Sequence, residues 1–245
     1  MNLMSLLTTP NARRAFVDEL SGVFRLDDAR FGSFVPSGLA DYYSKFQEIV
    51  SGYESRITEI NLIEHEDNRV EEIELRLCGK EPLTRLPVAI VYDQTSQGLH
   101  IRLYYSNYPI DQTHQDRAAI LPANHGLALP TPVSSYQKAF AEGDLDATLA
   151  MLEPTATVRE PSGGTFGADP GHAGLKDFYK LLYSFGGGIP LEYCSVIANV
   201  KSCALEYNIV RVGSNSYSPQ AGLAVYDFNE NRLTGIRIYD DFVPS

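Results

Sequence analysis

The sequence has too little positive charge and too few long apolar runs for several classes of protein. It contains 20 Lys and Arg against 31 Asp and Glu, which gives a net charge of −11. This balance argues against nucleic acid and anionic membrane surfaces as partners, because both bind basic faces. No stretch approaches the roughly 18 consecutive apolar residues of a membrane-spanning helix. We therefore expect neither a nucleic-acid partner nor a membrane partner.

Cysteine is also scarce, and its spacing does not form a disulfide framework. The three cysteines are Cys78, Cys194 and Cys203, an odd and sparse set that favours a reducing compartment. At the N-terminus a short apolar run precedes Arg13 and Arg14, whereas a signal peptide carries its basic residues first. These features predict a cytoplasmic location.

Motifs for metals, phosphates and covalent catalysis are missing as well. The five histidines are scattered, with no pair at helical i, i+4 spacing and no Cys/His cluster. The glycine-rich stretches "GGTFG" and "FGGGIP" do not follow the strand–turn–helix pattern of a phosphate-binding loop. We expect no metal ion and no cofactor.

The most informative feature of the sequence is an internal repeat. The segment "IRIYDDFVP" (Ile236–Pro244) repeats "IRLYYSNYP" (Ile101–Pro109) at a distance of 236 − 101 = 135 residues. "GLKDFY" (Gly174–Tyr179) repeats "GLADYY" (Gly38–Tyr43) at 174 − 38 = 136, and "VYD" recurs at 225 − 91 = 134. Three matches in one order at nearly one offset indicate that a whole domain is duplicated.

Each copy has helical patterns first and strand patterns afterwards. In the second copy, apolar spacing predicts two helices over residues 134–152, a short strand at "ATVREP", and a third helix over 171–183. Four β-rich runs then follow: Leu191–Val200, Cys203–Val212, Gly222–Phe228 and Leu233–Phe242. This order predicts an α+β fold with helices on one face of a curved sheet. We expect a first domain over 1–112, a linker over 113–132, and a second domain over 133–245.

The second copy resembles a known family. "YQKAFAEGDLDATLAMLEPTATVREPSGG" followed by "GLKDFY" resembles ketosteroid isomerase and other members of the nuclear transport factor 2 (NTF2)-like superfamily, including the SnoaL-like polyketide cyclases. The resemblance implies two cone-shaped domains, each with three helices on a curved, mostly antiparallel sheet (a cystatin-like roll). It further implies a cavity for a small apolar, carbonyl-bearing molecule and proton transfer of the isomerase or cyclase type. The alternative is a non-catalytic binding or structural module, since this superfamily hosts many functions.

The resemblance also implies roles for individual residues. The carboxylate that moves a proton falls on Glu160, and the tyrosine that stabilises the enolate falls on Tyr136. A supporting tyrosine falls on Tyr179. The late-strand Asp that completes the oxyanion site falls near Leu223, which cannot donate a hydrogen bond.

Strand alternation supports an inward Glu160 independently of the family. Glu160 shares a face of "ATVREP" with Ala156 and Val158, and a carboxylate in an apolar cavity is well matched to proton transfer near neutrality. Alternatively, Glu160 lies at the strand end and pairs with a surface cation. Tyr136 and Tyr179 could likewise be core residues with no part in a site.

Two further strands carry candidate binding residues. Asp240 shares a face with Ile236 and Ile238, so it would lie at the cavity end of an apolar row, unless it is a solvated C-terminal acid. Glu206 and Asn208 share one face of their strand, and alternation alone does not decide which face lines a cavity. We expect Tyr179, Glu206, Asn208 and Asp240 to bind substrate.

The repeat suggests that the two copies have different roles. Family members commonly pair two subunits through their sheets, so a duplicated chain would form this pair internally. We expect a monomer with an intrachain pseudo-dimer, or a dimer of such chains. An alignment on the shared "AF" dipeptide matches Tyr136 to Ala12 and Glu160 to Leu26. This predicts a degenerate first domain and an intact pocket in the second.

Overall fold

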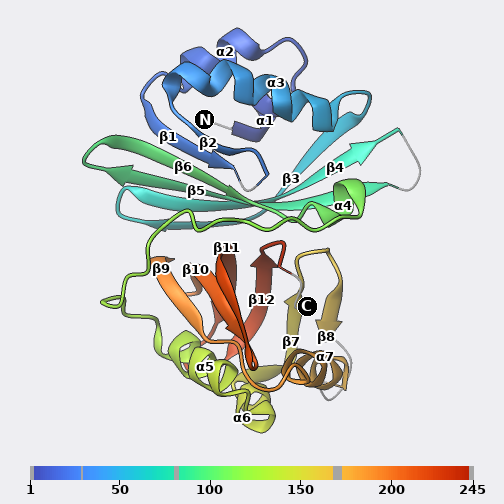
Figure 1. The fold of residues 1–245 in the computed structure, drawn as a ribbon, viewed down its shortest axis with the longest axis vertical. Coiled ribbons are helices and arrows are strands. Elements are labelled where there is room, and N and C mark those ends of the chain that lie inside the picture. Colours follow the sequence, from blue (N-terminus) through green and yellow to red (C-terminus); the bar gives the residue numbers. More distant parts are fainter. Residues whose placement is uncertain (1–2, 29, 80–82, 168–172, 243–245) are drawn as a thin grey trace. The chain divides into compact units, whose positions relative to one another are not determined.

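The computed structural model describes residues 3–28, 30–79, 83–167 and 173–242, in two compact units (Figure 1). The first unit spans Met1–Thr113 and the second His114–Ser245. In each unit the first three α-helices lie on one face of a single sheet (Figure 1). Among the described residues, no helix has the length and apolar character needed to cross a bilayer.

The first unit contains short helices followed by a six-stranded sheet. Its strand order is β2-β1-β6-β5-β4-β3, with β1 and β6 parallel and the other neighbours antiparallel. The elements are α1 (Leu3–Thr8), α2 (Arg13–Glu19), β1 (Val23–Asp28), β2 (Gly32–Phe34), the 3-10 helix η1 (Pro36–Gly38), α3 (Leu39–Val50), β3 (Glu54–His65), β4 (Asn68–Cys78), β5 (Thr84–Thr95), β6 (Gly98–Tyr104) and α4 (Tyr108–Asp111).

The second unit repeats this architecture. Its strand order is β8-β7-β12-β11-β10-β9, and β7 and β12 form the one parallel pair between these strands. The elements are α5 (Thr131–Glu142), α6 (Leu145–Ala150), β7 (Leu152–Arg159), β8 (Thr165–Gly167), α7 (Ala173–Tyr183), β9 (Leu191–Ala198), β10 (Ser202–Val212), β11 (Asn215–Phe228) and β12 (Leu233–Tyr239).

The matching strand orders confirm the predicted fold class. Two α+β domains with the same topology in one chain fit a tandem duplication of one domain. The two helices predicted over residues 134–152 are present. Gly143 takes the left-handed conformation that ends α5, and the Asp144 side chain accepts a hydrogen bond from the Ala147 N–H at the start of α6. β11 begins at Asn215, seven residues before the expected Gly222, because a bulge lets a polar segment continue the pairing with β10.

The parallel strands show which residues of the two units correspond. Arg102 of β6 pairs with Asp27 of β1, and Arg237 of β12 pairs with Arg159 of β7. The repeat matches Arg102 to Arg237, so Asp27 corresponds to Arg159.

It follows that Asp28 occupies the position of Glu160. The pairing of β1 with β2 and of β7 with β8 gives the same match, with Leu26 at the position of Val158. The expected match of Glu160 to Leu26 is therefore wrong. The alignment on "AF" counted residues through helices and loops of unequal length, whereas the hydrogen-bonded register of the strands does not depend on those lengths.

Ring contacts in the two cores agree with this correspondence. Phe34 and Tyr42 have ring centroids 5.0 Å apart, and their counterparts Phe166 and Phe178 are 4.7 Å apart. The helix α3 thus lies on its sheet as α7 does, and "GLADYY" is the structural equivalent of "GLKDFY".

Asp28 is sealed inside the first unit by four hydrogen bonds. The hydroxyls of Tyr42 and Tyr105 donate to its two oxygens at 2.9 Å each. The backbone N–H groups of Arg30 and Phe31 donate at 2.7 and 2.9 Å. Burial raises the pKa of Asp28, while these donors act in the opposite direction. Every oxygen of this carboxylate is satisfied within the fold.

The residues expected to form a linker contact the second sheet. The Arg117 N–H donates to Gln220 Oε1 at 3.0 Å, and the Ala221 N–H donates to the Arg117 carbonyl at 2.9 Å. Farther along, the Asn124 N–H donates to the Tyr193 carbonyl at 2.7 Å. This segment is part of the second unit.

Candidate functional site

The second unit encloses a cavity of about 320 Å³ between its helices and its sheet. This volume lies at the lower end of the range for small-molecule sites. Most of the lining is aromatic or aliphatic, including Phe140, Phe166, Phe178, Tyr226, Ile236 and Ile238. Three of the expected site residues, Tyr136, Glu160 and Asp240, line this cavity together.

Glu160 follows the last residue of β7 and is half-buried. Its Oε1 atom accepts hydrogen bonds from the Ser162 hydroxyl and, at 3.2 Å, from the Gly164 N–H. Gly164 permits this close approach, because a Cβ at that position would lie 2.7 Å from Oε1. One oxygen of Glu160 is thus held by its own loop.

Asp240 is the most deeply buried carboxylate of the cavity lining. It lies just after β12, is 7% exposed, and its Oδ2 accepts a hydrogen bond from the Tyr207 hydroxyl at 2.8 Å. Burial raises the pKa of Asp240 to about 6, although the Tyr207 hydrogen bond and the Arg117 charge act to lower it. The alternative of a solvated C-terminal acid is wrong, because the apolar row of β12 carries Asp240 into the interior.

A glycine on the neighbouring strand makes room for the ring of Tyr207. Gly222 of β11 pairs with Tyr207 of β10, and a Cβ on Gly222 would lie 2.5 to 2.9 Å from the Tyr207 ring and hydroxyl. The ring therefore crosses the glycine and reaches Asp240.

Replacing Gly222 with Ala should push Tyr207 off this path. We expect Gly222→Ala to lower the free energy of unfolding by about 1–3 kcal/mol, the usual cost of overpacking a core. Gly235→Ala on β12 is a matched control, since its nearest atoms would lie at 3.5 Å or more. Denaturant unfolding of the two variants measures the difference, and equal stability would show that Tyr207 does not depend on Gly222.

The hydroxyl of Tyr136, which lines the cavity, contacts the hydroxyl of a second tyrosine. The Tyr136 hydroxyl lies 2.9 Å from that of Tyr179, and burial raises the pKa of Tyr136 well above its usual value. Tyr179 is fully buried behind this contact and is not part of the lining. Tyr179 therefore contacts Tyr136 but does not reach the cavity, and its expected place among the substrate-binding residues is corrected.

Tyr226 is a cavity tyrosine that the sequence did not suggest. Its hydroxyl accepts a hydrogen bond from Gln137 Nε2 at 2.6 Å, and its ring centroid lies 5.9 Å from that of Tyr136. The expected late-strand donor was placed near Leu223, but Ala224 and Tyr226 are the β11 residues that line the cavity here. The alternation of β11 was the available signal, because Ala224 and Tyr226 share one face.

Glu206 and Asn208 do not line the cavity, and their expected place there is corrected. Tyr207 and Ile209 take the cavity face of β10, while Asn208 Nδ2 donates to the Leu121 carbonyl at 3.1 Å. The physical reason is the apolar row of the strand: Cys203, Leu205, Tyr207 and Ile209 pack together in the core. The more apolar of the two faces was the signal that could have decided this.

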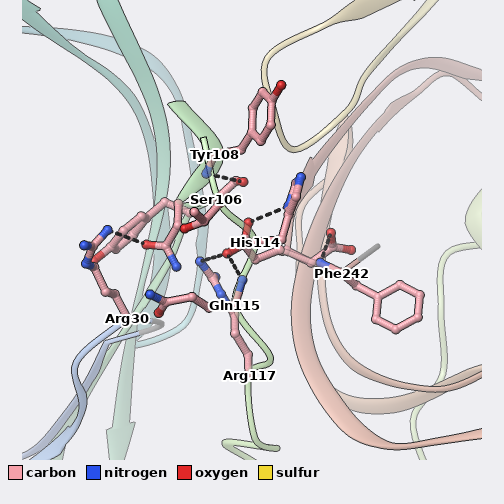
Figure 2. A network of polar contacts seen from close by, with 12 residues as sticks. Arg30, Ser106, Tyr108, His114, Gln115, Arg117 and Phe242 are labelled. Carbon is pink, nitrogen blue, oxygen red and sulfur yellow. Dashed lines mark hydrogen bonds and ion pairs between the residues drawn. The ribbon is translucent and has the colours of Figure 1, made fainter. Parts of the chain in front are cut away.

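Asp240 and Asp241 are neighbours in the chain, but their side chains have different surroundings. Asp241 is buried and is not part of the cavity lining. Its Oδ2 accepts the Gln115 N–H at 2.9 Å, and its Oδ1 lies 3.1 Å from His114 Nδ1 (Figure 2). These two contacts hold the start of the segment at His114 and Gln115 in place. His114 itself lines the cavity.

Comparison with known proteins finds similarity of structure only. No family model and no curated protein matches the sequence. A candidate polyketide cyclase from Sinorhizobium meliloti is 17% identical, with a TM-score of 0.38 over 45% of this chain and 94% of its own. An NTF2-like protein from Anabaena variabilis is 20% identical, with a TM-score of 0.37 over 46% and 85%. An LEH-like epoxide hydrolase from M. tuberculosis is 15% identical, with a TM-score of 0.38 over 46% and 81%.

The arrangement suits proton transfer on a bound small molecule. The cavity joins a carboxylate whose pKa lies near neutrality to two phenolic hydroxyls in an apolar enclosure. A carboxylate of this kind can take up or release a proton near pH 6, and hydroxyl donors can stabilise negative charge on an oxygen.

Proposed function

We propose that the second domain binds a small, largely apolar, carbonyl-bearing molecule and transfers a proton at the carbon next to the carbonyl, as an isomerase or cyclase does. The observation that carries this proposal is Asp240, a carboxylate with a pKa raised to about 6 by burial at an apolar cavity. A carboxyl group with such a pKa is mostly ionised at neutral pH, so it can accept a proton from the ligand and return it readily.

Asp240 is the proton acceptor in this proposal. An oxygen of its carboxylate takes the α-proton, the C–H electron pair moves into the carbon–carbon bond, and the carbonyl π electrons move to the oxygen. The enolate then regains a proton from Asp240 at the same or a neighbouring carbon. The Tyr207 hydroxyl, 2.8 Å from Oδ2, holds the carboxylate in position.

Tyr136 and Tyr226 are the groups that stabilise the enolate oxygen. Tyr179 can donate to Tyr136, and Gln137 donates to Tyr226, so both phenolic protons can be directed to the ligand. This pair of donors takes the place of the late-strand acid that Leu223 cannot supply. Glu160, the base in the sequence-based hypothesis, has one oxygen held by its loop and acts on another part of the ligand.

Proton exchange on a simple ketone tests the proposal without knowledge of the natural substrate. 2-Tetralone is an apolar bicyclic ketone with acidic α-protons. In D₂O, the protein should accelerate the exchange of these protons for deuterium. The loss of the α-proton signals in ¹H NMR spectra measures the rate. Binding of 2-tetralone without faster exchange would reject the proton-transfer proposal.

A non-catalytic binding module is the second candidate function. It is favoured by the hydrogen bonds of Tyr136, Tyr207 and Tyr226, each of which has a partner within the protein. In that case the cavity would bind 2-tetralone and leave its α-protons unchanged. The exchange experiment therefore separates the two functions.

A further inference from the structure

The two domains differ in one detail at the equivalent carboxylates Asp28 and Glu160. In both, the loop after the strand supplies donors to one oxygen: the Arg30 and Phe31 N–H groups in the first domain, and Ser162 with Gly164 in the second. The two tyrosine hydroxyls that complete the shell of Asp28 have no counterparts at Glu160.

The repeat shows which residues of the second domain stand at the positions of these two tyrosines. Tyr42 of α3 corresponds to Phe178 of α7, and Tyr105, which follows β6, corresponds to Asp240. Phe178 lacks the hydroxyl, and Asp240 is an acceptor bonded to Tyr207. Within the part of the chain that the structure describes, Glu160 Oε2 accepts no hydrogen bond.

Phe178, Asp240 and Glu160 all line the cavity of the second domain. The space that the Tyr42 hydroxyl and the Tyr105 side chain fill in the first domain is therefore part of the ligand site in the second. Glu160 lines this space and both of its hydrogen bonds reach Oε1, so its other oxygen can accept a hydrogen bond from a ligand hydroxyl. Charge-assisted O–H···O⁻ hydrogen bonds are among the strong ones.

We propose that the ligand of the second domain carries an aromatic hydroxyl group that donates to Glu160, in the way that Tyr42 and Tyr105 donate to Asp28 in the first domain. This inference rests on the proposed function, since it names the class of molecule that the same cavity binds. The ligand is a hydroxyaryl ketone: its hydroxyl is at Glu160 and its carbonyl is at Tyr136 and Tyr226.

The walls of the cavity suit a flat ring. Phe166 and Phe178 are stacked with centroids 4.7 Å apart, and Tyr136 and Phe140 are stacked at 5.6 Å. These four rings belong to the core around the cavity and line it. Aromatic ligands gain from offset or edge contacts with such rings, and in the first domain the Tyr105 side chain reaches the equivalent carboxylate.

Two probes that differ by one hydroxyl test the proposal. 2-Naphthol and naphthalene are equally flat and apolar, and their dissociation constants can be measured by fluorescence or by ligand-observed NMR. We expect the wild-type protein to bind 2-naphthol at least ten-fold more tightly than naphthalene. Glu160→Gln should reduce the affinity for 2-naphthol about ten-fold and change that for naphthalene less than two-fold, since a charged acceptor is lost.

Phe178→Tyr provides a gain-of-hydroxyl variant. It restores the donor that Tyr42 supplies in the first domain, so the new hydroxyl should donate a hydrogen bond to the Glu160 carboxylate. The variant should therefore also bind 2-naphthol about ten-fold more weakly. The matched control is Tyr42→Phe, which removes the equivalent hydroxyl from the first domain and should leave both affinities unchanged.

The outcomes distinguish this inference from the proposed function. Equal binding of the two probes by the wild-type protein, or equal effects of Glu160→Gln on both, overturns the aromatic-hydroxyl inference. If 2-tetralone exchange is still accelerated in that case, the proton-transfer function stands. If neither aromatic probe nor 2-tetralone binds, the proposed function falls together with the inference.

Discussion

Asp240→Asn should slow the α-proton exchange of 2-tetralone by about 10²–10⁴-fold, the usual contribution of a general base. Asn has the shape of Asp and can still accept the Tyr207 hydrogen bond at 2.8 Å. It has no basic oxygen, so only the proton acceptor is removed. Binding of 2-tetralone should change little, because the apolar walls of the cavity are untouched.

Two further variants sharpen this experiment. Asp227→Asn, at a carboxylate that pairs with Arg237 and does not line the cavity, should leave the exchange rate within about two-fold of the wild type. Tyr207→Phe removes a hydrogen bond that lowers the pKa of Asp240, so it should shift the pH dependence of exchange to higher pH. Full activity of Asp240→Asn would reject Asp240 as the base.

Asp28→Ala should lower the free energy of unfolding of the first domain by about 3 kcal/mol or more. The substitution leaves the hydroxyls of Tyr42 and Tyr105 and two backbone N–H groups without their acceptor. Each buried donor without a partner costs about 1–3 kcal/mol, partly offset by the removal of a buried acid. Water that enters the vacated space would reduce the cost further.

Hydrogen exchange followed by mass spectrometry can locate this effect in the first domain. Amides of β1 and β6 should lose protection in Asp28→Ala, while those of β7 and β12 should keep it if the domains open separately. Asp28→Asn retains an acceptor oxygen and is the milder control. Unchanged protection of β1 in Asp28→Ala would mean that this carboxylate does not hold the first domain together.

The repeat and the order of helices and strands could be read from the sequence. The matches around "GLKDFY" and "IRIYDD" gave the duplication, and the two sheets with one strand order confirm it. The internal pairing of the two domains stays a prediction. Register, by contrast, was not accessible from the "AF" alignment, because helix and loop lengths between equivalent strands are not equal. This is why Leu26 was matched to Glu160 in place of Asp28.

Strand alternation identified pairs of faces but did not always choose between them. It placed Glu160 and Asp240 correctly on the apolar faces of their strands, and both line the cavity. On β10 it left Glu206 and Asn208 as candidates. The larger apolar row on the opposite face decides which face of β10 points to the core and the cavity. The role of Gly222 depends on a cross-strand neighbour, which no local sequence pattern reveals.

The ionisation of Asp240 itself decides whether this carboxylate can serve as the base. A ¹³C NMR titration of the side-chain carboxyl groups, with the Asp240 signal assigned by its loss in Asp240→Asn, gives this pKa. Because burial raises the pKa of Asp240 to about 6, the signal should titrate near pH 6, and the exchange of 2-tetralone should rise with pH through the same midpoint to a plateau. A midpoint near the ordinary value of 3.8 would show that Asp240 is solvated, and would exclude Asp240 as the base for proton transfer in the cavity.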